Sequence, residues 1–343
     1  MKILFYSRPF SPSIGGVESV TRNLAESLTE SGNEVAVLTE TLSNDRDEFP
    51  FRVIRRPTAK QFMSSVKWAD IFVHQGVSLR AIWPLVFIRK PWVVVHHIWL
   101  PAAKWWRDPL NWLKRQVICF ANRNVAVSIA LAKSLEFPVS VIANSYDERI
   151  FQEQIQNPDN RKKDLIFVGR LIREKGADVI LAALQQLKKI GFLPSLTIVG
   201  GGQEEDAYHR IVRDSDLTAQ VEFAGIRQGY ELAELLNQHR ILVVPSSWAE
   251  PFGIVALEGI ACGCVVVGSD MGGLPEAIGP CGPTFPNKDV LALTQCLRTL
   301  LEKNGTEFSK FRANAKEHLR AHTKENVAKS YLLCFRNLLN PTS

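Results

Sequence analysis

Two glutamates and the start of a helix stand together in the stretch 245–276. Glu250 and Glu258 are eight residues apart, and Pro251 precedes a helix that is predicted to begin at about residues 252–253. The first amides of a helix have no partner inside it and lie at its positive dipole end. Carboxylates accept hydrogen bonds from hydroxyl groups and such amides bind phosphate oxygens, so this stretch suits a polyhydroxylated, phosphorylated ligand. The alternative is a loop acid and a helix acid that both face solvent. The amides concerned are those of Phe252, Gly253, Ile254 and Val255.

Two basic residues occur where a second candidate loop leads into a helix. The segment GRLIREKG (169–176) follows an apolar run and contains Arg170 and Lys175. Arginine can engage phosphate oxygens with two parallel hydrogen bonds and lysine acts as a point charge, so the pair suits a diphosphate. A solvated basic turn is the alternative. The chain contains neither the dinucleotide-binding G-x-G-x-x-G pattern nor a P-loop, which disfavours a dehydrogenase or an NTPase.

The elements that would position these residues alternate regularly along the chain. Apolar runs typical of buried strands alternate with helical segments in two successive series. The runs are 2–7, 34–39, 51–56, 70–75, 92–97, 124–128 and 139–144 in the first series, and 164–169, 195–202, 220–225 and 240–246 in the second. This alternation indicates parallel sheets with helices on both faces, which bind ligands beyond the carboxyl ends of their strands.

The repetition and the length of 343 residues predict two domains. We predict an α/β fold with two Rossmann-like doubly wound domains, over 1–145 and 164–323, joined by a polar linker over 146–163. A further helix is expected over about 324–343.

Composition indicates a globular protein of the cytosol. No apolar run reaches the roughly 18 residues that span a bilayer, and Arg8 interrupts the first apolar run before a signal-peptide core is complete. The six cysteines form no paired framework. Cys262 and Cys264 are too close in sequence for a usual metal pair, and the two D-x-D segments, 45–47 and 214–216, lie in charged surroundings. We expect no metal and no cofactor.

Four motifs together resemble the retaining glycosyltransferases of family 4. They are GGVE (15–18), FVGRLIREKG (167–176), PSSWAEPFGIVALEGIACG (245–263) and SDMGGLPE (269–276). The resemblance implies the GT-B architecture, with two domains facing across a cleft that holds the active site and closes around the donor. It also implies that the C-terminal helix crosses back onto the first domain. The implied reaction moves a sugar from a nucleotide-diphosphate sugar to a hydroxyl acceptor with retention of configuration.

The same resemblance assigns roles in binding the donor. Glu258 resembles the acid that binds the ribose, and Glu250 the acid that binds the donor sugar. Arg170 and Lys175 resemble the pair that stabilises the diphosphate leaving group, and Gly16 stands where a Gly-rich loop approaches the phosphates. The amides of residues 252–254 resemble further donor contacts. Preorganised cations and helix N-termini stabilise the departing diphosphate most when its charge is greatest, which supports these roles.

Histidines at the ends of two strands are candidates for the acceptor side. His96 resembles the family histidine that positions or polarises the acceptor. His97 must point the other way if the strand continues, because residues of a strand alternate between faces. His97 and His74 are weaker acceptor-binding candidates, and a structural role is the alternative for all three.

Two motifs depart from the family pattern. NSYD (144–147) stands where the family usually has Asn-Gly-x-Asp, so Ser145 occupies a position that commonly uses the conformational freedom of glycine. This puts the hinge geometry in question. ACGC (261–264) replaces a small-residue turn, and we expect only packing consequences.

Residues 89–123 contain seven basic residues, one acid and five tryptophans, so they account for the whole formal net charge of +6. Asp108 and Pro109 predict a helix start, and the apolar residues that follow at helical spacing are predicted to face the core: Leu110, Leu113, Val117 and Phe120. The remaining residues suit anionic lipid headgroups: Trp105, Trp106, Lys104, Arg107, Lys114 and Arg115. An acceptor cleft, an aromatic core and nucleic-acid binding are the alternatives, of which nucleic acid is the least favoured.

The family resemblance implies a hexosyltransferase acting on a lipid-linked or cell-surface glycan precursor, and the basic, Trp-rich segment predicts that it works at the inner face of a membrane. The donor base remains open among UDP, GDP and ADP. The alternatives are a non-catalytic nucleotide-sugar or lipid binding protein and a sugar-nucleotide epimerase of similar fold.

Overall fold

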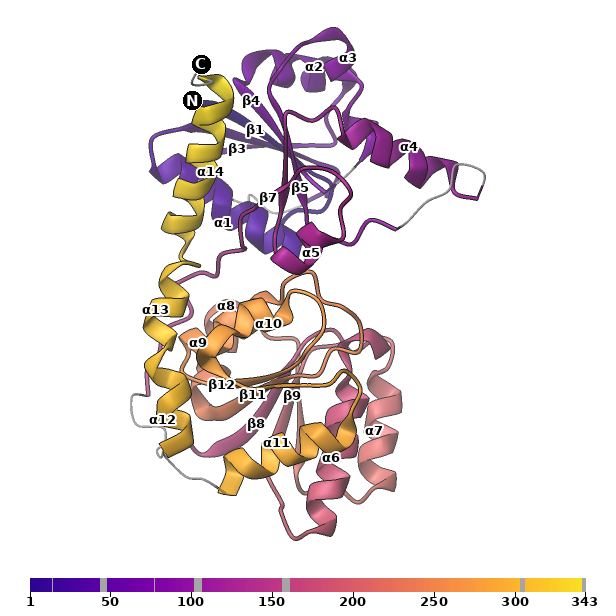
Figure 1. Cartoon of the computed structure of the whole chain (residues 1–343), viewed down its shortest axis with the longest axis vertical. Helices are drawn as coiled ribbons and strands as arrows, with labels where there is room; N and C mark the ends of the chain where they lie inside the picture. The colour runs from indigo at the N-terminus through magenta and orange to yellow at the C-terminus, as the bar shows by residue number, and fades with distance from the viewer. Residues whose placement is uncertain are drawn as a thin grey trace. The chain divides into compact units, whose positions relative to one another are not determined.

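A computed structural model of the chain describes residues 1–13, 15–43, 48–76, 78–101, 107–155, 161–302 and 306–340 (Figure 1). The chain divides into two compact units. Unit 1 comprises Met1–Ser145 and His322–Ser343, and unit 2 comprises Tyr146–Ala321.

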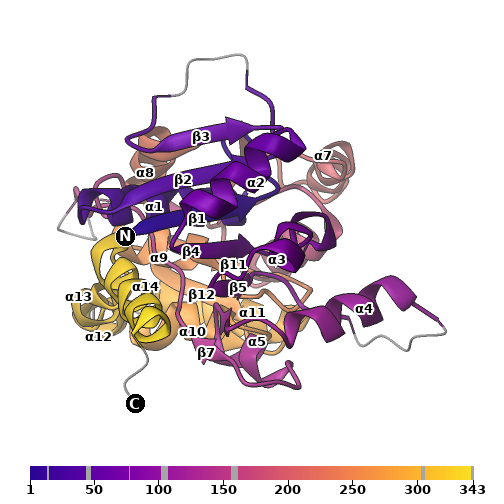
Figure 2. The same cartoon turned by 90° about the horizontal axis from the view of Figure 1, so that it is seen from above.

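Unit 1 is built on a parallel sheet with the strand order β3-β2-β1-β4-β5-β6-β7 (Figure 2). Its strands are β1 Lys2–Ser7, β2 Glu34–Thr39, β3 Arg52–Arg55, β4 Ile71–Gln75, β5 Trp92–His96, β6 Arg123–Ala126 and β7 Ser140–Val141. Its helices are α1 Gly16–Glu30, α2 Ala59–Trp68, the short turn η1 Leu79–Ala81, α3 Pro84–Phe87, α4 Pro109–Ile118, α5 Ile129–Lys133 and α14 Lys324–Leu339.

Helices cover both faces of this sheet. Leu4 and Tyr6 of β1 lie on one face and pack with Phe62 of α2. Ser7 points to the other face, where its hydroxyl lies 3.4 Å from that of Thr21 in α1. The C-terminal helix α14 packs on α1, so the two ends of the chain contribute to the same unit (Figure 1).

Unit 2 repeats the arrangement with the order β10-β9-β8-β11-β12-β13. Its strands are β8 Lys163–Val168, β9 Leu196–Val199, β10 Val221–Gly225, β11 His239–Val244, β12 Val265–Ser269 and β13 Thr284–Phe285. Its helices are η3 Arg173–Lys175, α6 Ala177–Lys189, α7 Glu205–Asp214, α8 Gly229–Gln238, α9 Ile254–Ala261, α10 Leu274–Ile278, η4 Gly279–Cys281, α11 Val290–Glu302, α12 Thr306–Ala313 and α13 Ala315–Arg320.

In each sheet the first three strands in chain order are added toward one edge and the later strands toward the other edge, as in the Rossmann fold. The predicted fold class of two Rossmann-like units is therefore confirmed. We call the place where the strand order reverses the switch point. The reversal falls between β1 and β4 in unit 1 and between β8 and β11 in unit 2. Ligands of such sheets bind beyond the carboxyl ends of these strands. The loops after them are where a site is expected.

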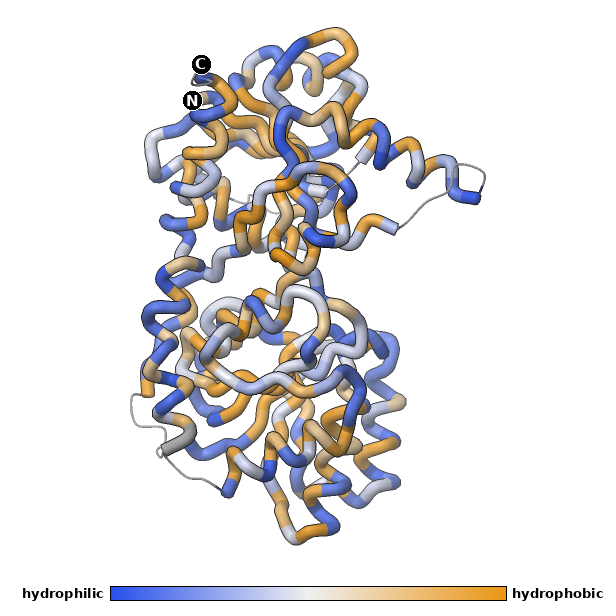
Figure 3. Tube along the Cα trace, in the orientation of Figure 1, coloured by the Kyte–Doolittle hydropathy of each residue, from blue (hydrophilic) through white to orange (hydrophobic). Residues whose placement is uncertain are grey.

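Helix α4 corrects one prediction. It begins as expected, because the carboxylate of Asp108 accepts from the amide of Asn111 at 3.1 Å and Pro109 occupies the first turn. However, Leu110, Leu113 and Phe120 are 58%, 44% and 82% exposed, and only Val117 of the four packs against the core. Helix α4 projects from the body of unit 1 (Figures 1 and 2), and along its tube in Figure 3 hydrophobic and hydrophilic residues are interspersed. Helical spacing therefore identified an apolar face without identifying what covers it.

The basic segment is only partly described. Lys104, Trp105 and Trp106 lie outside the described residues. Arg107 is exposed, but Arg115 is largely buried and pairs with Glu136 at 2.6 Å, so it is not a free surface cation. Within the described ranges, no helix is both long and apolar enough to cross a bilayer.

The two family departures have local explanations. Ser145 is buried and its φ is not positive, so this position does not need glycine. Cys262 and Cys264 are buried free thiols, consistent with a packing role. The segment 45–47 lies outside the described residues, and Asp216 of the other D-x-D segment pairs with Lys188 at 2.6 Å.

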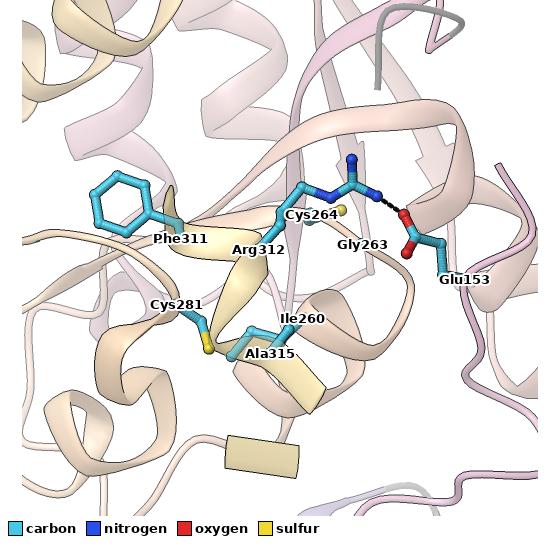
Figure 4. A pocket seen from close by; sticks show the side chains of 8 residues that line it. All are labelled: Glu153, Ile260, Gly263, Cys264, Cys281, Phe311, Arg312 and Ala315. Atoms are coloured by element: carbon cyan, nitrogen blue, oxygen red, sulfur yellow. Dashed lines mark ion pairs between the residues drawn. The ribbon is translucent and has the colours of Figure 1, made fainter. Parts of the chain in front are cut away.

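A buried arginine fixes the end of the predicted linker in unit 2. The Arg161 guanidinium donates to the carbonyl oxygens of Cys262 at 2.6 Å and His239 at 2.8 Å. Glu153 pairs with both Arg161 and Arg312, and Figure 4 shows the latter pair beside a small pocket that Cys264 also lines. Burial lowers the pKa of Arg161, and these acceptors offset the cost of burying its charge.

We expect Arg161→Met to destabilise unit 2 by about 3 kcal/mol, because buried acceptors would lose a charged donor. Differential scanning calorimetry measures the loss. Arg298→Met is the matched control, since Arg298 pairs with Glu302 on the surface with both side chains more than 40% exposed, and such pairs contribute only about 0.5 kcal/mol. Equal losses in the two variants would contradict the structural role of Arg161.

Candidate functional site

The loops after β8 and β11 are joined at the carboxyl edge of the unit 2 sheet. The amide of Ser247 donates to the carbonyl of Glu174 at 2.9 Å, and the Ser247 hydroxyl donates to the carbonyl of Arg173 at 2.9 Å. Gly176 has a φ of 72°, and a Cβ atom there would collide with the carbonyl oxygen of Pro245. Glycine therefore permits the close approach that brings the two predicted motifs together.

An ion pair forms where these loops meet. Lys175 Nζ lies 2.6 Å from Glu250 Oε1, and the Ser246 hydroxyl donates to the same oxygen at 2.6 Å. The Glu250 side chain is 8% exposed and that of Lys175 is 23% exposed. Both donors bind Oε1, and within the described ranges no other residue donates a hydrogen bond to Oε2. Lys175 also lies 5.9 Å from the ring centroid of Trp248.

The Gly-rich motif SDMGGLPE holds the backbone of Glu250. Glu250 forms a parallel bridge with Gly272, and its carbonyl accepts from the amide of Gly273 at 2.7 Å. Gly272 has a φ of 69°, and a side chain there would collide with the Glu250 backbone. The loop after β12 is thus a third element that fixes the carboxylate.

Helix α9 begins immediately after the ion pair. Its N-cap is Gly253, which has a φ of 104°, and Ile254 and Val255 are its first residues. The helix therefore begins one or two residues later than predicted, and Phe252 is buried beneath its start. The first amides of this helix present donors and a positive dipole end beside Glu250.

Glu258 lies one turn further along α9 and is half-buried. Burial raises the pKa of its carboxyl to about 7, and the charge of Asp147 adds to the effect. The described part of the chain provides no hydrogen-bond partner for this carboxylate. A carboxyl of this kind can accept a hydrogen bond from a ligand hydroxyl when ionised.

Arg170 stands at the mouth of the same loops. The Ile172 amide donates to the carbonyl oxygen of Arg170 at 2.9 Å, and the Leu171 amide donates to that of Gly201 at 3.0 Å, so hydrogen bonds of the turn hold the Arg170 backbone. The Arg170 side chain is exposed and pairs with no other described residue. It is therefore a cation that is positioned through its backbone and open to an anionic ligand.

The histidines of unit 1 do not gather in one place. His74 is fully buried, where its Nδ1 accepts from the indole of Trp92 at 3.2 Å and its ring meets Tyr6 edge-on. Burial lowers the pKa of His74 to about 3. The ring of His74 therefore packs in the apolar core, which favours the structural alternative, and its contact with an acceptor stays a prediction.

His96 and His97 are both buried and bind different partners. His96 Nε2 lies 3.0 Å from Asn124 Oδ1, and its ring packs near Phe137. His97 Nε2 lies 2.5 Å from Gln75 Oε1. Gly16 is exposed at the first position of α1. Apart from Gly16, each of these residues follows or ends a central strand of the sheet.

Three residues near these sites were not predicted. Ser246 shares an oxygen with Lys175, Trp248 lies over the same ammonium group, and Gln75 holds His97. Ser246 and Gln75 end or directly follow strands whose carboxyl ends were expected to bind ligands. Their positions at the carboxyl ends of β11 and β4 could have marked them as site residues. Neither a serine nor a glutamine, however, indicates by its type which residue it binds.

The chain matches two family models. Residues 148–319 match the model described as glycosyl transferases group 1, and residues 14–149 match that of glycosyltransferase family 4. Glycogen synthase of Mycobacterium tuberculosis (strain CDC 1551 / Oshkosh) is 32% identical over 198 residues, which are 56% of this chain and 47% of that protein. The chain thus spans about half the length of the curated relatives it matches.

Solved structures show the same fold. Sucrose-phosphate synthase from Thermosynechococcus elongatus superposes with a TM-score of 0.81 at 21% identity, covering 98% of both chains. Anabaena HepE in complex with UDP and glucose superposes with a TM-score of 0.78 at 19% identity, covering 98% of this chain and all of that one. Because the group 1 model spans half of the chain and the family 4 model most of the remainder, the protein belongs to the family 4 glycosyltransferases and has their GT-B fold.

Proposed function

We propose that this protein is a retaining glycosyltransferase of the hexosyltransferase class, moving a sugar from a nucleotide-diphosphate sugar to a hydroxyl acceptor. The Lys175–Glu250 pair between Arg170 and the start of α9 carries the proposal. It combines a carboxylate for sugar hydroxyls with cations and amides for phosphate at one sheet edge. HepE, a relative in fold, binds UDP and glucose.

In this proposal the two carboxylate oxygens of Glu250 bind different partners. Oε1 is occupied by Lys175 and Ser246, so Oε2 is the oxygen that accepts from a hydroxyl of the donor sugar. Lys175, Arg170 and the α9 amides then lie where negative charge grows as the diphosphate departs. Donors fixed before the reaction need no reorganisation at that moment, so they favour the transition state over the bound substrate.

The proposed donor contacts extend along α9. Glu258 accepts from a ribose hydroxyl, and the amides of Ile254 and Val255 contact phosphate or sugar oxygens. We propose that Gly16 of unit 1 approaches the phosphates, since its missing side chain allows close contact with a backbone amide. No metal or cofactor is included in the proposal.

A donor screen tests the function directly. UDP-, GDP- and ADP-sugars would be compared by thermal shift, and the anomeric proton of the product would be followed by NMR for retention. Slow release of nucleotide without acceptor supports a transferase. Binding without any turnover would instead indicate a nucleotide-sugar binding protein, and a new sugar still bound to nucleotide would indicate an epimerase.

We expect Lys175→Ala to lower kcat on the order of a hundredfold, because one preorganised charge on the leaving group is lost. KM for the donor should change less. Lys188→Ala is the matched control, since Lys188 pairs with Asp216 on the surface. Because the variant leaves the buried Glu250 carboxylate without its cation, its melting temperature would be measured to confirm that it is folded. Unchanged kcat in folded Lys175→Ala would remove Lys175 from the mechanism.

Donor affinity should rise as the pH increases from about 6 to 8, because Glu258 ionises near pH 7 and the ionised form is the stronger acceptor. Glu258→Gln should abolish this dependence and weaken binding about tenfold or more, since a hydrogen bond to a charged group contributes about 1.5–3 kcal/mol. Calorimetric titration with nucleotide measures both effects. Glu302→Gln, on the surface of α11, should retain the wild-type profile.

The raised pKa of Glu258 also makes the folded chain bind a proton more tightly than the unfolded chain. Stability should therefore fall as the pH rises from the ordinary range of a glutamate to about 7. Glu258→Gln should remove this loss. A profile that stays pH-dependent in the variant would show that another group is responsible.

We propose that the acceptor is a lipid-linked or cell-surface glycan precursor, reached at the inner face of an anionic membrane. Helix α4 supports this proposal, because Trp112 joins Leu110 and Leu113 as exposed apolar residues beside the exposed Arg107. An apolar face flanked by basic residues suits a bilayer interface. Arg115 was also predicted to contact the membrane, but its ion pair with Glu136 reduces the charge that it offers to lipid headgroups.

We expect the triple variant Leu110→Ser/Leu113→Ser/Phe120→Ser to float poorly with vesicles of phosphatidylglycerol and phosphatidylcholine, while the wild type floats at low salt. The variant loses apolar area that would enter the interface, at about 25 cal/mol per Å². Leu193→Ser/Leu291→Ser is the control, since both leucines are exposed in unit 2. Flotation that is equal in all three proteins, or absent from the wild type, would argue against this surface.

A further inference from the structure

The carboxyl ends of β4 and β5 place their polar residues on two different faces. Gln75 is paired with Val95, and His74 with Val94, so Gln75 shares a face with His97 and His74 shares a face with His96. The amide of Gly76 donates to the carbonyl of Val95 at 2.9 Å, which continues the pairing beyond Gln75.

The face of Gln75 and His97 is also that of α1. Ser7 is paired with Gln75 across β1 and β4, and the Ser7 hydroxyl approaches Thr21 of α1. Helix α1 begins at Gly16, so this face carries the glycine turn at the same edge of the sheet. His96 points away from it, toward Asn124, which is paired with Val94.

The Asn124 amide fixes the proton of His96. Asn124 Nδ2 donates to the carbonyl of Ile118 at 3.3 Å, so Asn124 Oδ1 is the atom that faces His96 Nε2. His96 Nε2 therefore carries a proton, and Nδ1, which has no partner among the described residues, is enclosed near Phe137. This arrangement is that of a structural histidine.

Like His96 Nδ1 and His74 Nε2, one nitrogen of Gln75 is buried without a partner among the described residues, but Gln75 lies on the face of α1 and the two histidines lie on the other face. Gln75 Oε1 lies 2.5 Å from His97 Nε2, while Gln75 Nε2 is buried and has no partner among the described residues. A buried donor without an acceptor costs about 1–3 kcal/mol. Such a donor at the ligand-binding edge of a sheet indicates that a ligand oxygen is its acceptor.

We propose that Gln75 is a positioning residue that holds His97 as the Nε2–H tautomer, leaving Nδ1 to accept a hydrogen bond from a hydroxyl of the sugar substrates. Gln75 Nε2 donates to an oxygen of the same substrates. The inference rests on the proposed glycosyl transfer and moves the acceptor-side role from His96 to His97. It assigns the hydroxyl contact to the face on which α1 begins.

The neutral form of His97 is favoured at ordinary pH. Burial lowers its pKa to about 3, and the neighbouring His96 adds to this effect. No carboxylate acts on His97 within the described residues, and Gln75 is uncharged. Its Nδ1 lone pair is thus available wherever the enzyme is assayed.

Nitrogen NMR of the resting enzyme, labelled with ¹⁵N-histidine, tests the tautomer without any substrate. The His97 signals would be assigned by their loss in His97→Asn. We expect a protonated Nε2 and a bare Nδ1 in the wild type, with both tautomers populated in Gln75→Leu. A bare Nε2 in the wild type, as a reversed Gln75 amide would produce, overturns the proposal even if the enzyme transfers sugar.

Kinetics with the donor that the thermal-shift screen selects, and with an acceptor that turns over with it, test the role. His97→Asn and Gln75→Leu should each lower kcat on the order of tenfold or more, whereas the matched variant His96→Asn should change it less than twofold if it folds. Donor binding, measured separately, should persist in all three. A larger loss in folded His96→Asn than in His97→Asn would return the role to His96.

Gln75→Glu provides a rescue by pH. The new carboxylate still accepts from Nε2–H but raises the pKa of His97, because it stabilises the imidazolium. Activity should therefore be lost as the pH falls through the raised pKa and recover above it, while the wild type shows no such loss. An unchanged acid side of the kcat profile in folded Gln75→Glu would contradict the contact.

Discussion

The ion pair between Lys175 and Glu250 is the interaction on which the unit 2 site depends. A carboxylate that is almost fully buried is stable only if a cation and further donors satisfy it, because the protein interior solvates charge poorly. Lys175 comes from the loop after β8 and Glu250 from the loop after β11. The pair can form only because β8 and β11 are neighbours at the switch point, where the strand order of the sheet reverses.

The glycines of this region follow from the same requirement. Gly176 and Gly272 have positive φ, and at each a side chain would collide with the backbone of a neighbouring loop. Three loops must therefore approach more closely than side chains allow if the carboxylate is to receive its donors. The Gly-rich segments, which match no phosphate-binding fingerprint, serve in part to pack these loops together.

The sequence was sufficient for the fold because its signals were local and repeated. Buried strands read as apolar runs, and their alternation with helices left few topologies. Pairs of charged residues at the carboxyl ends of strands were predicted for the same reason, and Lys175 and Glu250 do meet. The contact itself needed the sheet order, which no single segment encodes.

Predictions failed where burial depends on elements far apart in sequence. The spacing of Leu110, Leu113 and Phe120 gave a correct helix, but an amphipathic pattern cannot distinguish a core from an uncovered face. The surroundings of His74 could not be predicted for a related reason. That His74 lies in the core is fixed by Tyr6 of β1 and Trp92 of β5, which only the assembled sheet brings beside it.

The two units reach similar geometry by different electrostatic means. In unit 2 the polar groups at the switch point are charged and compensate each other. In unit 1 the buried polar groups Ser7, Gln75 and His97 are neutral, and burial keeps His97 uncharged. A departing diphosphate requires fixed positive charge, whereas a hydroxyl that is to be oriented requires a lone pair and no charge. The difference between the two edges is therefore what a transfer between a charged donor and a neutral hydroxyl would demand, with the same strand order providing both frameworks.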